Sequence, residues 1–405
     1  MLNEGHRNLG FSTYDSAREL IDDGIDSGAK KISLTIYQGD VLKNSWCWLY
    51  EDTGSGIRSS TLRDVFKFSK NLEPDILKNG KYHWGLTGAV LALAKRTDIY
   101  SKTIGDDWYY TYLDFTESSK GLTPQVYKCA PPLLTQDFDF TLRNEQEDSG
   151  TIIHIRDINE INMPGTYNFD GLLRELRNKL GETYGDDLVQ GIEIYINGET
   201  AEAIDPLLLN EKARYVQEYG KSKEFCKFNI YFGEIEDHLK DKQFIDEIKE
   251  VYLNDISKHA ITVRLVCLYH GNKAKLPVDL KPSIINSGFY IKRNKRLIGR
   301  AEKFIIGSHQ KFTHFRAEIT FSPVFDKFFA VQVNKSRYLV HDIIVNLINE
   351  KIIKLLKPYF GEKSSSAPSL IEKAINHYKL SPIETPTIIE NQEDNKSFSF
   401  NKKKI

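Results

Sequence analysis

The sequence has few cysteines and no long apolar run. It contains four cysteines in 405 residues, and Cys47, Cys129, Cys226 and Cys267 lie far apart without a CxxC pair. A zinc site or a disulfide framework is therefore not expected, and a reducing cytoplasmic compartment is. No apolar run approaches the length that crosses a bilayer, and the first ten residues, MLNEGHRNLG, hold no apolar segment of signal-peptide type. We therefore expect a cytoplasmic protein without a membrane partner.

The sequence also lacks an excess of either charge. Lysine and arginine number 55 against 56 aspartates and glutamates, for a formal net charge of −1. Such a balance gives no overall field that attracts nucleic acid or an anionic membrane, so any contact of this kind would need a local patch. Hydrophobic residues make up 40% of the chain, which is typical of a globular protein, and its length is enough for two domains with their own cores.

The most informative stretch is residues 12–31, STYDSARELIDDGIDSGAKK. Small and apolar residues recur there at the spacing of a buried helix face, namely Ala17, Leu20, Ile21, Gly24, Ile25 and Gly28. A stripe of carboxylates occupies another face and consists of Glu19, Asp22, Asp23 and Asp26. Because like charges at this spacing repel, Mg²⁺ bound together with phosphate oxygens would stabilise the stripe. A solvated acidic face near a helix N-terminus is the alternative, and spacing alone favours it.

Two glycine-containing motifs follow this helix. A strand at 46–50 leads into Asp52-Thr53-Gly54-Ser55-Gly56, where a carboxylate can accept a hydrogen bond from an exocyclic amine and the glycines allow close approach of a ligand. After a polar segment at 69–82, Gly85, Leu86, Thr87 and Gly88 begin an apolar helix, whose N-terminus attracts phosphate. An ordinary loop and a helix that packs through small residues are the respective alternatives.

The remaining chain predicts an α+β protein in two blocks. The first block has predicted strands at 31–37, 46–50, 99–101, 108–115, 151–155 and 191–196, and helices at 60–68 and 169–185. The second has predicted strands at 226–233, 261–269, 284–292, 297–300 and 315–322, and helices at 241–254 and 338–356. We expect domains at 1–205 and 206–360, followed by a weakly ordered basic tail at 361–405 with one short helix at 368–379.

The ordered set of motifs resembles the GHKL ATPase superfamily of gyrase B, heat-shock chaperone ATPases, histidine kinases, MutL and MORC. Residues 19–29 resemble its ExxxN helix, 52–56 its adenine-binding motif and 84–89 its lid-to-helix phosphate motif. Gly150-Thr151 matches the pair that completes the adenine site. The resemblance covers roughly residues 8–200, and the motifs are specific only as an ordered set. It implies a Bergerat-type ATP-binding α/β sandwich.

The second block resembles a transducer domain. Residues 288–298, GFYIKRNKRLI, are similar to a transducer hairpin of MORC and MutL-like ATPases, which implies an S5-like α/β fold and disfavours a histidine kinase. In that fold a transducer lysine reaches the γ-phosphate. Lys335 in VNKSR is at the matching position, and a solvated surface lysine is the alternative.

The resemblance also implies residue roles. Glu19 would be the general base that activates the attacking water. Asp23 would bind Mg²⁺ where the family usually has Asn, and its extra charge would weaken nucleotide binding or raise the Mg²⁺ requirement. The predicted adenine-site residues are Asp52, Gly54, Gly56 and Thr151, and the predicted phosphate-site residues are Gly85, Leu86, Thr87 and Gly88. His83 and Thr87 depart from the family's Gly and Lys. The resemblance therefore leaves open how strongly the phosphates are bound and how fast ATP is hydrolysed.

The implied function is Mg²⁺-dependent ATP hydrolysis that closes the segment at 69–82 as a lid and joins two protomers into a homodimer. A nucleotide-gated binding module with little turnover and a chaperone-like ATPase are the alternatives. DNA and a separately encoded effector protein are implied partners. The cationic candidates for DNA are Lys292, Arg293, Lys295, Arg296, Arg300 and Lys402–Lys404, for which a solvated charged turn is the competing interpretation.

Overall fold

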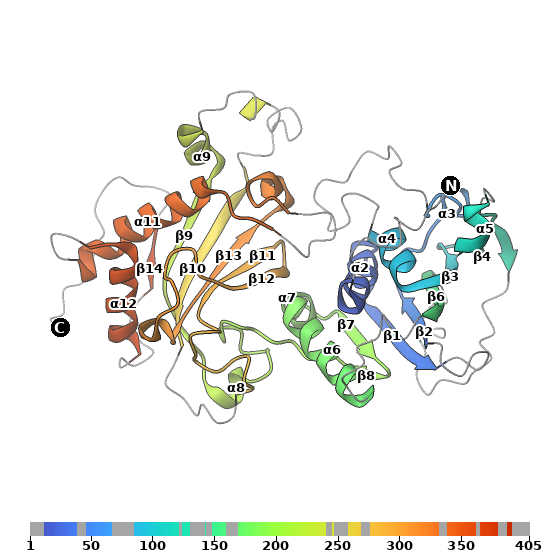
Figure 1. Ribbon diagram of the computed structural model, residues 1–405, viewed down its shortest axis with the longest axis horizontal. Coiled ribbons are helices and arrows are strands. Elements are labelled where there is room, and N and C mark those ends of the chain that lie inside the picture. Colours follow the sequence, from blue (N-terminus) through green and yellow to red (C-terminus); the bar gives the residue numbers. More distant parts are fainter. Residues whose placement is uncertain are drawn as a thin grey trace.

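The computed structural model describes residues 12–38, 46–66, 85–120, 124–129, 142, 148–158, 169–239, 245–246, 258–268, 276–331, 338–361, 365–379 and 387–390. Its strands form two separate sheets that lie side by side along the long axis of the molecule, each with helices of its own (Figure 1). The predicted α+β class is confirmed. Within the described part of the chain, no helix is both long and apolar enough to span a membrane.

The first sheet has eight strands in the order β5-β4-β3-β6-β2-β1-β7-β8. They are β1 (Lys31–Gln38), β2 (Trp46–Asp52), β3 (Ala94–Lys102), β4 (Trp108–Asp114), β5 (Tyr127–Cys129), β6 (Gly150–Ile158), β7 (Glu193–Ile196) and β8 (Glu199–Thr200). Described neighbours pair antiparallel except β1 with β7, which pair parallel. This order places β2 beside β6 at the centre of the sheet, which is important for the site.

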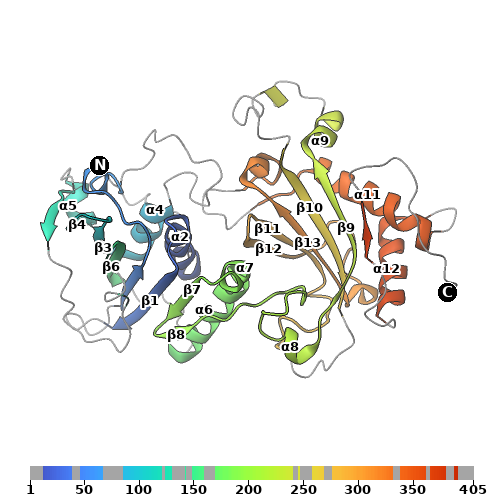
Figure 2. The same cartoon turned by 180° about the vertical axis from the view of Figure 1, so that it is seen from behind.

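Helices cover one face of this sheet. They include α2 (Thr13–Asp26), α4 (Gly85–Leu93), α6 (Phe169–Thr183) and α7 (Gly185–Val189), with α3 (Ser59–Leu62) and α5 (Phe115–Ser119) near one end (Figure 1 and Figure 2). The Ser12 hydroxyl accepts from the Asp15 N–H at 3.1 Å and the Asp15 carboxylate accepts from the Ser12 N–H at 3.2 Å, so a capping box starts α2. Leu20 and Ile21 of α2 are buried in the core against the sheet, as the helical spacing predicts.

The second sheet has six strands in the order β12-β11-β13-β10-β9-β14. They are β9 (Lys223–Tyr231), β10 (Ala260–Cys267), β11 (Gly288–Arg293), β12 (Arg296–Glu302), β13 (Phe315–Phe321) and β14 (Ile388–Ile389). The helical elements of this part are α8 (Val216–Tyr219), α9 (Phe232–His238), α11 (Asp342–Phe360), α12 (Ala367–Tyr378) and two 3₁₀ turns at Gln310–Phe312 and Pro323–Phe328. Phenylalanine and isoleucine from one face of the sheet pack with α11 and α12 into a single core. The predicted division at 205/206 falls between β8 and β9.

The C-terminal segment differs from the expected weakly ordered tail. The predicted short helix is present as α12, and Leu370, Ile371 and Ile375 bury its apolar face in the core of the second sheet. Residues 388–389 add β14 to the edge of that sheet beside β9. The packing of these apolar residues explains why this part is ordered. Residues 391–405, and most of the predicted helix at 241–254, lie outside the described residues.

Candidate nucleotide-binding site

The predicted adenine residues meet at the centre of the first sheet. Asp52 ends β2, and Thr151 lies directly opposite it near the start of β6. The Asp52 side chain is 4% exposed, and its Oδ1 accepts a hydrogen bond from the Gly54 N–H at 2.8 Å. A strand end therefore delivers a carboxylate and a hydroxyl to one place, although 99 positions separate them in the sequence.

The two glycines of the motif are required by close packing. A Cβ atom on Gly54 would overlap the Ser27 side chain at the end of α2. Gly56 has φ of +70°, and a Cβ atom there would overlap the Lys102 carbonyl at the end of β3. The loop is thus pressed between α2 and β3, which holds Asp52 and its neighbours in a fixed position.

Ser101 belongs to the same site and was not predicted from the sequence. Its Oγ lies 2.9 Å from Thr151 Oγ1, accepts the Ile57 N–H at 2.8 Å and donates to the Gly150 carbonyl at 3.1 Å. Ser101 therefore joins β3, β6 and the glycine loop. In the sequence this residue shows only strand alternation, so no local signal could have identified it.

The environment of Asp52 changes its protonation. Burial raises the pKa of the Asp52 carboxyl to about 6, and the backbone N–H groups of Gly54 and Thr151 oppose that rise only in part. The group is consequently ionised at neutral pH but takes up a proton in mild acid. Only the ionised carboxylate is a pure acceptor for an amino group.

The helix that carries Glu19 lies beside the predicted phosphate motif. Glu19 is buried, at 2% exposure, and Asp23 is exposed one turn further along α2. The Ser16 hydroxyl donates to the Ala89 carbonyl at 3.4 Å, which ties α2 to α4. Gly85 is the first residue of α4, the end of the helix that carries the positive pole of its dipole. Leu86, Thr87 and Gly88 are buried in its first turns, and the Thr87 hydroxyl donates to the Val65 carbonyl at 3.3 Å.

Comparison with known families agrees with this geometry. Residues 14–142 match the family model described as histidine kinase-, DNA gyrase B-, and HSP90-like ATPase. This segment is therefore similar to ATPases of the GHKL superfamily. The match includes the acidic helix, the Asp52 motif and α4, and it ends before Thr151 and the second sheet. No curated protein matches the chain. Because of this similarity, we use the name GHKL domain for the first sheet and its helices, including the part that follows the matched residues.

The acidic stripe of the GHKL domain is divided in the structure. Asp22 is fully buried, accepts the Tyr184 hydroxyl at 2.8 Å and forms an ion pair with Arg296 of the second sheet. Neither a solvated acidic face nor stabilisation by Mg²⁺ therefore describes Asp22, because burial beside the cation Arg296 satisfies its charge.

Asp23 is placed where it could bind Mg²⁺ together with the phosphates of a nucleotide. Among the described residues, no group of three or more histidine, cysteine or acidic side chains is arranged to hold a metal. Asp23 is a hard oxygen ligand at an exposed position, and Mg²⁺ usually combines one or two such carboxylates with phosphate oxygens and water. Asp23 consequently fits the predicted role in the presence of a triphosphate.

The predicted DNA-binding hairpin is not a cationic surface. Lys292 lies between Glu318 and Asp186 at 2.8 and 2.9 Å, and Arg293 pairs with Asp326 at 2.7 Å. Lys295, between β11 and β12, lies 3.6 Å from Asp187, and Arg300 pairs with Glu182 at 3.2 Å, so both face the GHKL domain. Both predicted interpretations, a phosphate-binding surface and a solvated turn, are wrong for Lys292, Arg293 and Arg296, because acidic partners bury these side chains.

Several predicted features fall outside the described residues. These are Lys335, His83, the predicted lid at 69–82 and Lys402–Lys404. Their predicted roles rest on the resemblance alone.

Proposed function

We propose that the protein is a Mg²⁺-dependent ATPase of MORC/MutL-like type, with the second sheet as its S5-like transducer domain. The observation that carries the proposal is the meeting of Asp52 and Thr151 at adjacent strand ends, beside the helix that holds Glu19 and Asp23. A buried acceptor, a buried carboxylate and a helix N-terminus thus lie in one region of the GHKL domain.

Each group has a distinct task in this proposal. Asp52 accepts the hydrogen bond of the adenine amino group, and Gly54, Gly56 and Thr151 shape the surrounding surface. The phosphates lie at the start of α4, where the predicted residues are Gly85 to Gly88. Glu19 orients the attacking water and accepts its proton, since positioning dominates phosphoryl transfer. Asp23 holds Mg²⁺, which when bound neutralises charge on the phosphate oxygens.

The direct test is ATP turnover with and without metal. We expect phosphate release by the wild-type protein in excess Mg²⁺, and a fall to the background rate when EDTA removes the metal, because the phosphate charge is then not neutralised. ATP affinity is measured in parallel by titration with a fluorescent ATP analogue. Equal turnover with EDTA, or failure of ATP to bind in either condition, would contradict the proposal.

A nucleotide-gated binding module is the second candidate. The exposed carboxylate of Asp23 supports it, because an added negative charge beside a triphosphate opposes binding and slows turnover. Saturable ATP binding in Mg²⁺ without phosphate release would favour this candidate. The chaperone-like alternative gains no supporting contact from the described residues.

Nucleotide-dependent dimerisation is a further part of the proposal and follows from the resemblance. A non-hydrolysable ATP analogue is expected to double the mass measured by light scattering from the monomer value of 46.6 kDa. The physical reason is that γ-phosphate contacts can order the segments that form an interface. Asp52→Ala is the control, because loss of adenine binding is expected to keep it monomeric. A wild-type protein that stays monomeric with bound analogue would contradict dimerisation.

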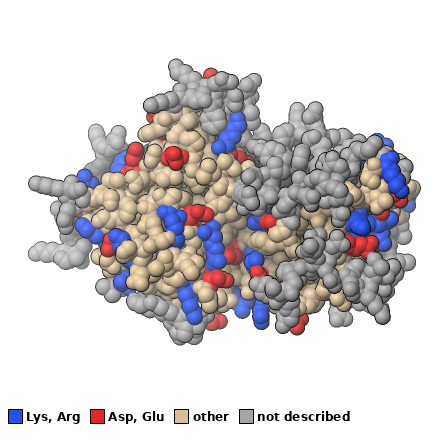
Figure 3. All heavy atoms as spheres, in the orientation of Figure 1, with Lys and Arg blue, Asp and Glu red and all other residues tan. Residues whose placement is uncertain are grey.

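DNA and a separately encoded effector protein stay predictions from the resemblance. The hairpin cations that were expected to contact phosphates are held by carboxylates. On the face shown in Figure 3, basic and acidic side chains are interspersed over the described part of the surface. A DNA contact would therefore not use Lys292 or Arg293.

A further inference from the structure

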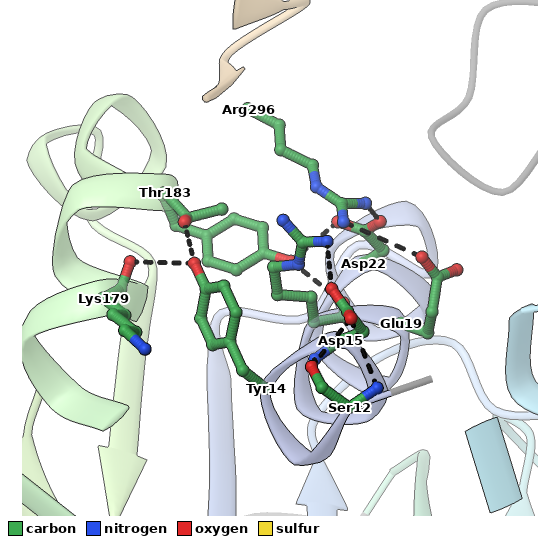
Figure 4. Close-up of polar contacts among 10 residues, drawn as sticks. Ser12, Tyr14, Asp15, Glu19, Asp22, Lys179, Thr183 and Arg296 are labelled. Atoms are coloured by element: carbon green, nitrogen blue, oxygen red, sulfur yellow. Dashed lines mark hydrogen bonds and ion pairs between the residues drawn. The ribbon is translucent and has the colours of Figure 1, made fainter. Parts of the chain in front are cut away.

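One side chain of the second sheet reaches the proposed catalytic carboxylate. Arg296, the first residue of β12, is 1% exposed and lies over α2 (Figure 4). Its Nη1 forms an ion pair with Asp22 Oδ2, and its Nη2 lies 3.7 Å from Glu19 Oε1. A guanidinium from the second sheet is therefore shared by two buried carboxylates of the GHKL domain.

Neighbouring contacts hold the carboxylate partner of this guanidinium in place. The buried Tyr184 hydroxyl lies 2.8 Å from Asp22 Oδ1 and 2.9 Å from the Arg18 carbonyl, which holds Asp22 in place. Arg18 itself pairs with Asp15 at 2.6 Å. Burial, followed by the charge of Arg18, lowers the pKa of Arg296 to about 10, so Arg296 keeps its charge at neutral pH. Arg296 thus meets Asp22 and Glu19 as a cation.

The charges explain why Glu19 needs this partner. Glu19 and Asp22 are three residues apart on one helix, where like charges repel each other. Both side chains are buried, so water screens this repulsion poorly. Without a cation between them, this repulsion turns one carboxylate away from the other. Such a turn would remove the orientation of Glu19 that the proposed reaction needs.

We propose that Arg296 is a positioning residue for Glu19, so that hydrolysis depends on docking of the second-sheet hairpin against the GHKL domain. This inference rests on the proposed ATPase function. It assigns to the hairpin a task in the chemical step, separate from nucleotide binding. Arg296 acts through its positive charge and its planar donors; a lysine keeps the charge but lacks the planar fork of donors.

A role of Arg296 in docking alone predicts a different effect on turnover. Arg300 of the same hairpin is the matched control. Arg300, also on β12, pairs with Glu182 at 3.2 Å and so joins the same two parts of the chain. Its ion pair with Glu182 and its hydrogen bond to the Asp279 carbonyl do not involve Glu19. If docking alone mattered, loss of either arginine would have the same effect on turnover.

The test compares Arg296→Met, Arg296→Lys and Arg300→Met with wild type in single-turnover ATP hydrolysis at saturating ATP and Mg²⁺. Arg296→Met is expected to lower the rate about 10- to 100-fold while the ATP dissociation constant changes less than about threefold. Arg296→Lys is expected to recover part of the rate, and Arg300→Met to stay within about threefold of wild type. In a Glu19→Gln background, Arg296→Met should cause no further loss.

Three results would overturn the inference: equal losses in Arg296→Met and Arg300→Met, a loss of affinity in place of rate, or an undiminished effect of Arg296→Met in the Glu19→Gln background. Thermal melting checks that each variant is folded. If Arg296→Met does not fold, the partial loss of rate in Arg296→Lys at unchanged affinity decides the question. A wild-type protein that releases no phosphate would instead overturn the ATPase proposal itself, and this inference with it.

Discussion

Replacing Glu19 by glutamine is expected to lower kcat for ATP hydrolysis by about 10²- to 10⁴-fold, the usual contribution of a positioned general base. The amide cannot accept the proton of the attacking water. It matches the carboxylate in shape, so the buried site beside α4 is expected to stay intact. ATP affinity is expected to remain within about threefold of wild type, because the group acts on water in the transition state. Phosphate release and equilibrium titration measure the two quantities separately.

Glu199→Gln provides the matched control for this experiment. Glu199 lies on the edge strand β8, exposed and paired with Arg177 at 2.7 Å, so the same chemical change occurs away from α2. Its effect on kcat is expected to be within about twofold, as for a surface ion pair. If Glu19→Gln and Glu199→Gln both hydrolyse ATP like wild type, then Glu19 is not the general base. If Glu19→Gln loses ATP affinity, its role is in binding.

ATP binding is expected to weaken about tenfold when the pH falls from 7 to 5, because Asp52 has a pKa of about 6 in the nucleotide-free protein. The direction of this pH dependence follows from the protonation state of Asp52 that binds adenine. The ionised carboxylate accepts a hydrogen bond from the adenine amino group. The protonated carboxyl carries an O–H donor of its own, which would face the amino donor. Adenine binding therefore favours the ionised form, and affinity is lost as the pH falls through 6. Titration with the analogue at several pH values measures this slope.

Two Asp52 variants test the assignment. Asp52→Asn removes the titrating group, so its binding curve should lose the inflection near pH 6. Asp52→Ala is expected to lower ATP affinity about 10- to 100-fold at pH 7, as for loss of a hydrogen bond to a charged group. Wild-type affinity that does not change between pH 5 and 7, or an unchanged slope in Asp52→Asn, would rule out this role for Asp52.

The same pKa has a consequence for folding stability. The Asp52 carboxyl binds its proton more tightly in the folded protein, at a pKa of about 6, than at the ordinary value of 3.8. Between these two values the folded state holds more protons than the unfolded state. The contribution of this group to stability therefore falls as the pH rises through that window, which is the reverse of an ion-paired aspartate.

Local patterns predicted the parts of the site that depend on neighbours in the chain. The apolar period of α2 follows from 3.6 residues per turn, and Leu20 and Ile21 are buried as that period requires. The strand before Asp52 and the helix that begins at Gly85 could be predicted for the same reason. What failed was the assignment of Asp22 to an open acidic stripe and of the hairpin cations Lys292, Arg293 and Arg296 to DNA or solvent. Asp22 and Arg296 look like solvated residues in the sequence, yet each is buried by the other.

The sequence by itself determined the α+β class, the first-block elements that carry the site and the residue types that suit a nucleotide, because helix and strand periods and glycine turns are local properties of the chain. Only the tertiary structure decided which charges meet. Pairing of β2 with β6 brings Thr151 to Asp52, and docking of β12 on α2 brings Arg296 to Glu19. These contacts join segments far apart in the chain, and whether a charge is exposed or buried depends on the segment that covers it, which no local pattern records.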